Sequence, residues 1–386
     1  MHFRPQNGTA LALSGLLTAA LALAGCGSDE AEPAGKRIAE PIAVTYDGGI
    51  HVLDGTTLEL HGSTALEGFN RLNPAGDDRH LMVSHKDSFR VYDAVAAEFT
   101  DIEFPGAKPG HVVQHAGRTV LFADGTGEVT SFDPVRLADG KPATEAYKSA
   151  APHHGVAIEL ADGSLVVTLG TEEKRTGIAV LDAQRKEIAR NEDCPGVHGE
   201  ATAEGDTVVV GCQTGALVYR GGVITKVTSP TPYGRIGNQA GSEESTIVLG
   251  DYKKDKDAEL ERPQQVSLID TVTGTLRLVD IGTSYTFRSL GRGPQGEALV
   301  LGTDGRIHVI DPVAGTVTRT IPVIDSWQEP LKWQQARPAL FVRGGVAYVS
   351  DPATKKVHRV DLAAGAVTAS VTLPDSPNEL SGVLAH

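Results

Sequence analysis

Hydrophobic and polar residues alternate in short runs along most of the chain, and turns containing glycine or aspartate separate these runs. Alternation with a period of two over about four to eight residues is typical of a β-strand with one buried face. Beyond the N-terminal region, no helical pattern of useful length interrupts this alternation. The pattern therefore predicts an all-β protein.

One unit recurs along the chain: an apolar strand, a turn containing glycine, and a second strand that ends in a hydrophobic residue and aspartate. The clearest copy is ALVLGTDGRIHVIDPVAGTVTRTI at residues 298–321, and the other seven begin near residues 43, 81, 120, 165, 208, 247 and 347. A spacing of roughly 40 to 50 residues is the period of four-stranded propeller blades. We therefore expect residues 41–386 to form a single β-propeller of eight blades, with seven as the alternative if one unit is irregular.

A weaker segment precedes the first strand of most units, as in HGVAIELADG at 154–163 and HGEATAEGD at 198–206. In a propeller this segment is the innermost strand of the blade, which lines the central channel. The first unit lacks such a segment, whereas the C-terminus supplies a spare one, NELSGVLAH at 378–386. We expect the C-terminal strand to complete the first blade, because this closure removes an open sheet edge.

The N-terminal region has the order of an export signal: the basic residue Arg4, the apolar run LALSGLLTAALALAGC at 11–26, and small residues at its end. The ending LALAGC resembles a bacterial lipobox, whose cysteine becomes the lipidated first residue. We expect residues 1–25 to be a lipoprotein signal peptide, Cys26 to be lipidated, and 26–40 to be a flexible tether. The protein would then be extracytoplasmic and lipid-anchored to the bacterial cell membrane. A transmembrane anchor is the alternative, but the apolar run is short and acidic residues follow it.

The composition is acidic, with 49 Asp and Glu against 35 Lys and Arg and a formal net charge of −14. Nucleic-acid binding needs a positive field to neutralise phosphates. We therefore exclude nucleic acid as a partner.

Two cysteines remain when Cys26 is assigned to lipid, namely Cys194 and Cys212. In an oxidising extracytoplasmic compartment an even pair normally forms a disulfide. A thiolate metal site is the alternative, but these cysteines lack the close-spaced pairs of a zinc knuckle. We expect a disulfide between them.

Three consecutive units carry a histidine at the start of the innermost strand. His111, His154 and His198 lie six, nine and seven residues before the glycine of the next turn. Inner strands run side by side along the propeller axis, so these imidazoles are expected to meet at one mouth of the channel. Neutral imidazole is a good zinc ligand, and three histidines with a carboxylate or water fill a tetrahedral shell. Gly155 and Gly199 follow two of the histidines, and we expect them to leave space for the metal.

Several residues near these histidines are further candidates. Asp124, Glu200 and Asp193 are candidates for a fourth ligand or for a carboxylate that orients an imidazole. His153 and His115 lie in the same segments and are candidates to substitute or to flank the site. Strand alternation places His153 and His154 on opposite faces, and the match to the His198 segment favours His154. The histidines on other strands and turns are interpreted as structural or solvent-facing: His51, His61, His80, His85, His308 and His358.

The segments HHGVAIELADGSLVVT at 153–168 and DCPGVHGEATAEGDTVVVGCQTGALVY at 193–219 resemble the AztD family of secreted zinc metallochaperones. Members of that family are β-propellers that pass zinc to the solute-binding protein of a zinc-importing ABC transporter. The resemblance extends from about residue 105 to the C-terminus. It implies that His198 and the histidines of the His153–His154 pair are metal ligands and that Cys194 pairs with Cys212, whereas His111 rests on the repeat pattern.

The chain departs from the family at its N-terminus. Family members commonly carry a histidine-rich segment near the mature N-terminus, and residues 26–40 contain no histidine. If that segment is needed for transfer, delivery must use another surface, or the protein stores zinc instead.

The sequence thus predicts a monomeric zinc metallochaperone, not an enzyme, with the solute-binding protein of a zinc ABC transporter as partner. One alternative is a zinc-dependent hydrolase or lactonase-like propeller, because three histidines and a water also form a catalytic zinc site. The calcium of propeller lactonases prefers oxygen ligands, which disfavours that variant. The other alternative is a lipoprotein scaffold for protein interactions, in which the insertion at 250–265, predicted as a solvated hairpin, would serve as a docking segment.

Overall fold

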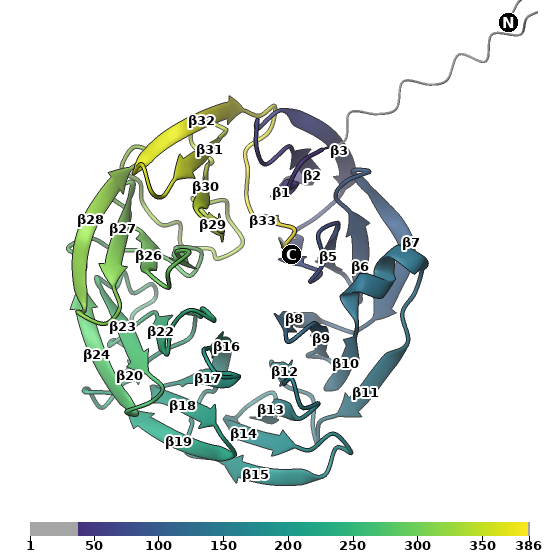
Figure 1. Ribbon diagram of the computed structural model, residues 1–386, viewed down its shortest axis with the longest axis vertical. Coiled ribbons are helices and arrows are strands. Elements are labelled where there is room, and N and C mark those ends of the chain that lie inside the picture. Colours follow the sequence, from purple (N-terminus) through teal and green to yellow (C-terminus); the bar gives the residue numbers. More distant parts are fainter. Residues whose placement is uncertain (1–37, 385–386) are drawn as a thin grey trace, which may run out of the picture. The chain divides into compact units, whose positions relative to one another are not determined.

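The strands of the described part of the chain form eight sheets that surround a common centre, and all their pairings are antiparallel except that of β18 with β20 (Figure 1). The computed structural model describes residues 38–384, so the predicted signal peptide, the lipidation site Cys26 and nearly all of the tether lie outside the described residues. Each sheet is one blade of four strands, and blade 5 carries one additional short strand. The prediction of an all-β, eight-bladed propeller is confirmed.

The first four blades contain the following elements. Blade 1 has β1 (Ile42–Tyr46), β2 (Gly48–Leu53), β3 (Leu60–Leu66) and β33 (Leu380–Gly382); blade 2 has β4 (Arg71–Pro74), β5 (His80–His85), β6 (Ser88–Asp93) and β7 (Glu98–Pro105). Blade 3 has β8 (Pro109–His115), β9 (Arg118–Ala123), β10 (Glu128–Phe132), the short 3-10 helix η1 (Pro134–Asp139) and β11 (Thr144–Lys148); blade 4 has β12 (Ala157–Glu159), β13 (Leu165–Gly170), β14 (Arg175–Leu181) and β15 (Glu187–Asn191).

The remaining four blades complete the ring. Blade 5 has β16 (His198–Ala203), β17 (Thr207–Cys212), β18 (Thr214–Arg220), β19 (Val223–Thr228) and the added β20 (Gly234–Arg235); blade 6 has β21 (Gln239–Ala240), β22 (Ile247–Gly250), β23 (Gln265–Asp270) and β24 (Thr275–Asp280). Blade 7 has β25 (Leu290–Arg292), β26 (Ala298–Leu301), β27 (Arg306–Asp311) and β28 (Thr316–Pro322); blade 8 has β29 (Leu340–Arg343), β30 (Val346–Asp351), β31 (Lys356–Asp361) and β32 (Ala366–Thr372).

The C-terminal strand closes the ring. In β33, Leu380 and Gly382 pair antiparallel with Val44 and Ile42 of β1, so the two ends of the described chain share one sheet (Figure 1). This pairing occupies the inner edge of β1, and the predicted closure is confirmed.

The hydrophobic core lies between neighbouring blades. The second strand of each blade is buried on both faces; every residue of β17, for example, is buried. The outermost strands alternate between exposed and partly buried residues, as β7 does. One core cluster joins blades 3, 4 and 5 through Val113, Ile158 and Val210, and each such buried aliphatic side chain contributes about 1.5 to 3 kcal/mol. The blades that carry the candidate histidines are therefore packed rigidly against one another.

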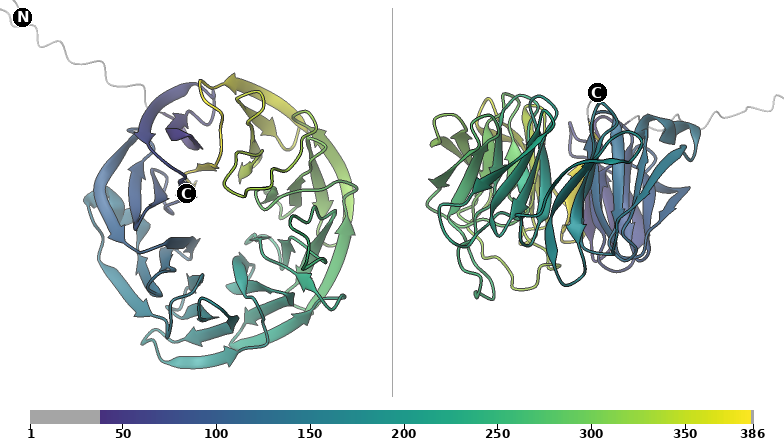
Figure 2. Two further views of the ribbon diagram at one scale, coloured as in Figure 1. Left: turned by 180° about the vertical axis from the view of Figure 1, so that it is seen from behind. Right: turned by 90° about the horizontal axis from the view of Figure 1, so that it is seen from below.

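The ring seen from its other face and from the side is shown in Figure 2. The insertion at 250–265 forms an irregular loop between β22 and β23, so its prediction as a hairpin is wrong. Its charged residues provide no alternating apolar face to pair, and the Glu261 carboxylate instead accepts hydrogen bonds from the backbone N–H groups of Lys254 and Asp255. In the part of the chain that is described, no helix has the length and hydrophobicity required to cross a membrane.

Candidate metal centre

Three imidazoles from three adjacent blades meet at one end of their inner strands. His111 lies on β8, His198 begins β16, and His154 lies in the segment before β12. One ring nitrogen of each residue lies within 4.8 Å of the others, and the Nε2 atoms of His154 and His198 are 3.0 Å apart. The structure therefore brings together the three histidines that the repeat pattern singled out.

Local irregularity in the sheets directs these side chains. The pairing of β8 with β9 shifts register between Pro109 and Val112, and that of β16 with β17 shifts between His198 and Glu200. Such bulges turn a side chain away from the regular alternation of the strand. His154 precedes its strand altogether, whereas His111 lies within one register shift and His198, paired with Gly211, lies next to the other.

Each of the three imidazoles has its Nδ1 atom bound to an oxygen acceptor. The pairs are His154 with Asp124 Oδ2 at 2.5 Å, His111 with Glu200 Oε2 at 3.0 Å, and His198 with the Gly237 carbonyl oxygen at 2.6 Å. An acceptor at Nδ1 holds the proton there and leaves the Nε2 lone pair free for a metal. Metal-binding histidines in proteins are almost always oriented in this way.

None of the three carboxylates that the sequence suggested as a fourth ligand, Asp124, Glu200 and Asp193, is placed to share a metal with the imidazoles. Asp124 and Glu200 hold imidazoles, and among the described residues neither belongs to the group whose atoms are placed to share one metal. Asp193 lies away from the cluster: its side chain is 73% exposed and is 3.9 Å from the Lys226 ammonium. A tetrahedral metal held by the three imidazoles would therefore take its fourth ligand from outside this group.

Gly199 is required by a close approach of backbone, not by space for a metal. Its φ is +70°, and a Cβ atom there would lie 2.5 Å from the Gly237 carbonyl oxygen and 2.2 Å from Gln239 Oε1. That carbonyl oxygen is the acceptor for His198. At Gly155 a Cβ atom would meet the Phe122 ring at 2.4 Å. The expectation that these glycines clear the metal position is thus replaced by a role in packing.

Two other candidate histidines have both ring nitrogens engaged elsewhere. His153 is buried, and its Nδ1 and Nε2 atoms lie 2.9 Å and 3.0 Å from the Ala151 carbonyl oxygen and Thr168 Oγ1. His115 lies at the opposite end of β8, with Nε2 bound to Asp206 and Nδ1 3.5 Å from Glu243. The structure therefore does not bring either residue to the cluster.

The environment lowers one imidazole pKa and raises another. Burial, followed by the positive charges of its two histidine neighbours, holds the pKa of His198 well below its ordinary value. Burial also lowers the pKa of His111, but the charge and hydrogen bond of Glu200 outweigh it and raise that pKa overall. Burial thus favours the uncharged form of His198, which is the form that binds a metal, whereas Glu200 favours the protonated form of His111.

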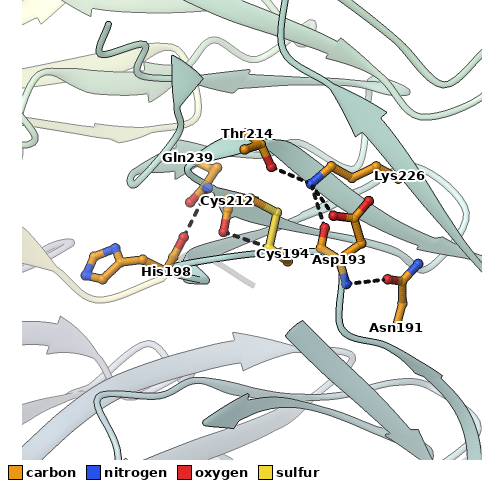
Figure 3. Close-up of a disulfide and its surroundings, with 9 residues drawn as sticks. Asn191, Asp193, Cys194, His198, Cys212, Thr214, Lys226 and Gln239 are labelled. Carbon is orange, nitrogen blue, oxygen red and sulfur yellow. Dashed lines mark hydrogen bonds and ion pairs between the residues drawn. A yellow bond between two sulfur atoms is a disulfide. The ribbon is translucent and has the colours of Figure 1, made fainter. Parts of the chain in front are cut away.

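A disulfide between Cys194 and Cys212 braces the approach to β16, as predicted (Figure 3). Both cysteines are fully buried, and their sulfur atoms belong to the core shared by blades 3 to 5. Cys212 ends β17, at the same end of the hairpin as His198. Figure 3 also shows Gln239, whose Nε2 atom donates to the His198 carbonyl oxygen at 3.4 Å. The disulfide and the hydrogen bond from Gln239 thus both fix the backbone where β16 begins.

A cavity of about 180 Å³ adjoins the cluster toward the propeller axis. Residues from five blades and two connecting loops line it, among them Arg71, His111, Glu200, Gly237 and Phe287. The cluster can therefore be reached by a small ligand.

Sequence reasoning missed the Gly237 carbonyl oxygen, because a backbone acceptor in a loop leaves no residue-type signal. It also did not pair Glu200 with His111, which lies two blades away. The recurrence of a histidine at the start of three consecutive inner strands was a signal for the imidazoles alone.

A zinc chaperone is among the curated proteins that are similar to this chain in sequence. No protein-family profile matches the chain. The zinc chaperone AztD of Citrobacter koseri is 26% identical over 302 residues, which are 75% of this chain and 69% of that protein.

Two solved structures of AztD are similar to this chain in fold. The structure of apo AztD from Citrobacter koseri has a TM-score of 0.78 and 22% identity and covers 90% of this chain and 98% of its own. A second crystal structure of Citrobacter koseri AztD has a TM-score of 0.76 and 22% identity, covering 89% and 96%. The dihydro-heme d1 dehydrogenase NirN is a more distant propeller, with a TM-score of 0.58, 12% identity and coverage of 88% and 74%. The resemblance inferred from the sequence is therefore confirmed: the chain is similar in sequence and in fold to the zinc chaperone AztD.

Proposed function

We propose that this protein is an extracytoplasmic zinc metallochaperone that binds Zn²⁺ through His111, His154 and His198. The observation that carries the proposal is the convergence of these imidazoles with every Nδ1 atom bound to an oxygen. Three neutral nitrogen donors with one open position match the coordination that zinc adopts in accessible sites. Zinc is the transferred ligand, and the three imidazoles that bind it are already held in position before zinc arrives.

The exposure of the site suits transfer better than storage. The His154 side chain is 42% exposed, whereas that of His111 is 20% exposed. A recipient protein can therefore reach the metal on the His154 side and replace ligands one at a time. His154 is the ligand that we expect to leave first.

The relationship to AztD supports a chaperone role, because the curated relative is named as a zinc chaperone. We propose that the recipient is the solute-binding protein of a zinc ABC importer. The predicted lipid on Cys26 would keep the chaperone at the membrane face where such importers operate. The residues that carry this anchor lie outside residues 38–384.

The enzyme alternative has less support from the geometry. A hydrolytic zinc site needs a free carboxylate or imidazole as general base near the metal-bound water. Asp124 and Glu200 are the carboxylates bound to the cluster, and each is engaged with an imidazole Nδ1 atom. The alternative of a protein-interaction scaffold does not explain why three imidazoles converge.

The test is the zinc affinity and metal content of the protein after single replacement of His111, His154 or His198 by Ala. His61→Ala is the matched control, because His61 is exposed on β3 and, within residues 38–384, its ring bonds to the Val95 carbonyl oxygen alone. We expect one tightly bound zinc in the parent and in the control, and loss of tight binding in each of the three variants.

Zinc transfer is measured separately, by mixing the loaded protein with the zinc-free solute-binding protein. If the parent protein does not bind zinc, the proposed function is wrong. Zinc binding without any transfer would leave a storage or catalytic protein.

A further inference from the structure

The acceptor that holds His198 differs in charge from those that hold the other two imidazoles. Those two are bound at Nδ1 by a carboxylate, Asp124 or Glu200. His198 is instead bound by the Gly237 carbonyl oxygen, at 2.6 Å. A neutral acceptor orients a ring but raises its basicity less than a carboxylate does. The groups behind this carbonyl therefore decide how strong a ligand His198 is.

A buried carboxylate, that of Asp251, lies behind the carbonyl group. Asp251 directly follows β22 in blade 6 and is 2% exposed. Its Oδ1 atom accepts hydrogen bonds from Gly237 N at 2.6 Å and Asn238 N at 3.2 Å. Its Oδ2 atom accepts one from Asn238 Nδ2 at 2.9 Å. Each of these partners is a donor, which suits a carboxylate because an ionised carboxylate only accepts.

A single peptide group connects Asp251 with His198. The Gly237 carbonyl and the Asn238 N–H belong to the same peptide, and in a trans peptide these two groups point in opposite directions. One end is bound to His198 Nδ1 and the other to Asp251 Oδ1. Hydrogen bonds in such a chain polarise one another. The negative charge of Asp251 therefore makes the carbonyl oxygen a stronger acceptor for His198.

Asp251 has the same position in blade 6 as Asp124 has in blade 3. Each is the first residue after the second strand of its blade, β22 or β9. The backbone N–H of each donates to the residue just before the innermost strand: Asp251 to the Asn238 carbonyl at 2.9 Å, and Asp124 to the Lys108 carbonyl at 3.0 Å. Asp124 contacts the His154 imidazole directly. The repeat thus places an equivalent aspartate at the cluster twice, once in contact with an imidazole and once one peptide group away.

The charge of Asp251 lacks a cationic partner. Within residues 38–384 no Lys, Arg or His side chain forms an ion pair with it. The Arg235 guanidinium lies against Gly237 but is not paired with this carboxylate. Burial of a carboxylate is costly without a counter-charge, and its N–H partners offset only part of that cost. A metal ion at His198 Nε2 would supply positive charge at the far end of the same hydrogen-bond chain.

We propose that Asp251 is a positioning residue of the zinc site, which acts on His198 through the peptide group between Gly237 and Asn238. It fixes the orientation of the carbonyl group and raises the basicity of the imidazole. Each of the three zinc ligands is then supported by a carboxylate, two by direct contact and one through a peptide. The inference rests on the proposed function for the metal, whereas the hydrogen-bond chain from Asp251 to His198 is also present in the metal-free protein.

The experiment compares the full chain with Asp251→Asn and with the control Asp77→Asn. Asparagine keeps the size of the side chain and one oxygen acceptor but removes the charge. Asp77, between β4 and β5 of blade 2, is a matched control because it is 5% exposed and also accepts two backbone N–H groups, those of Arg79 and His80.

Two quantities are measured. Competition with a zinc-binding dye gives the zinc affinity. NMR of the metal-free protein with ¹⁵N-labelled histidine gives the proton resonance of His198 Nδ1–H, which is assigned by its loss in His198→Ala. The resonance moves upfield when its hydrogen bond weakens, so it reports on His198 itself and not on the stability of the fold.

We expect Asp251→Asn to weaken zinc binding about tenfold, the lower end of the range for partners that orient a ligand, and to move the His198 resonance upfield. Asp77→Asn should change neither quantity. Asn238→Ala keeps the peptide N–H and should leave the resonance in place. If Asp251→Asn does not fold, Asp251→Ser is the second neutral variant, with the same expected results.

An unchanged zinc affinity in the neutral variants of Asp251, or an equal loss in Asp77→Asn, would overturn the inference. A loss of affinity without any movement of the resonance would also overturn it, because Asp251 would then act on the fold alone. Failure of the parent to bind zinc would instead overturn the proposed function. In that case the resonance still shows whether Asp251 acts on His198.

Discussion

The two ends of strand β8 carry a histidine each, and the two residues have opposite environments. At one end, His111 has one nitrogen bound to Glu200 and the other facing two more imidazoles. At the other end, His115 has Asp206 at one nitrogen and Glu243 near the other. A histidine becomes a candidate ligand when one nitrogen is held and the other is left free, and it becomes a structural residue when both are engaged.

The largest difference between the two ends should be seen in zinc binding after their histidines are removed. His111→Ala should weaken zinc binding by at least about a hundredfold, because loss of a ligand exceeds the loss of an orienting partner. His115→Ala should leave the zinc affinity unchanged and lower only the free energy of unfolding. Competition with a zinc-binding dye measures both affinities; equal losses would contradict the comparison.

The disulfide braces only the end of the β16–β17 hairpin that carries His198. Replacing Cys194 and Cys212 together by Ser should lower the free energy of unfolding by about 3 kcal/mol, because the unfolded chain gains freedom. Denaturant unfolding in zinc-free buffer measures this loss. The folded variant should still bind one zinc, since neither sulfur is a ligand; loss of zinc binding at unchanged stability would argue for a thiolate site.

The carboxylates that hold the imidazoles should have an intermediate effect. Glu200→Gln and Asp124→Asn keep the shape of each side chain but remove its charge. Each should weaken zinc binding by about 10- to 100-fold, which is typical of partners that orient a ligand. Asp206→Asn, at the other end of β8, is the control and should not change the affinity.

The smallest effect that we predict is a shift in the pH dependence of zinc binding. Glu200 raises the pKa of His111, so a proton competes with zinc there at pH values above those for an ordinary imidazole. His198, whose pKa is well below the ordinary value, does not compete in the same range. Zinc affinity should therefore fall as the pH is lowered from about 8 to about 6.

The matched variant tests the cause. In Glu200→Gln the fall should begin at lower pH, because the charge that raises the pKa of His111 is gone. Zinc titrations at a series of pH values measure both profiles, and identical midpoints would exclude this role of Glu200.

The repeat pattern was sufficient to predict the eight blades, their closure by the C-terminal strand and the meeting of the three histidines. These features depend on period and alternation, which are properties of the sequence itself. The pairing of Cys194 with Cys212 was predictable because the cysteine count allowed one partner. The hydrogen bond from His198 to the Gly237 carbonyl oxygen was not predictable, because a backbone carbonyl in a loop has no compositional signature.

The insertion at 250–265 was predicted wrongly for a related reason. Its conformation depends on the backbone contacts of Glu261 and on pairing of Lys253 with Arg235, which are tertiary contacts.

The most direct test of the account is the position of zinc in crystals of the loaded protein, located by anomalous scattering at the zinc edge. The account predicts one strong peak about 2.0 to 2.1 Å from the Nε2 atoms of His111, His154 and His198. A peak beside His115 and Asp206 at the other end of β8, with none between the three imidazoles, would contradict it.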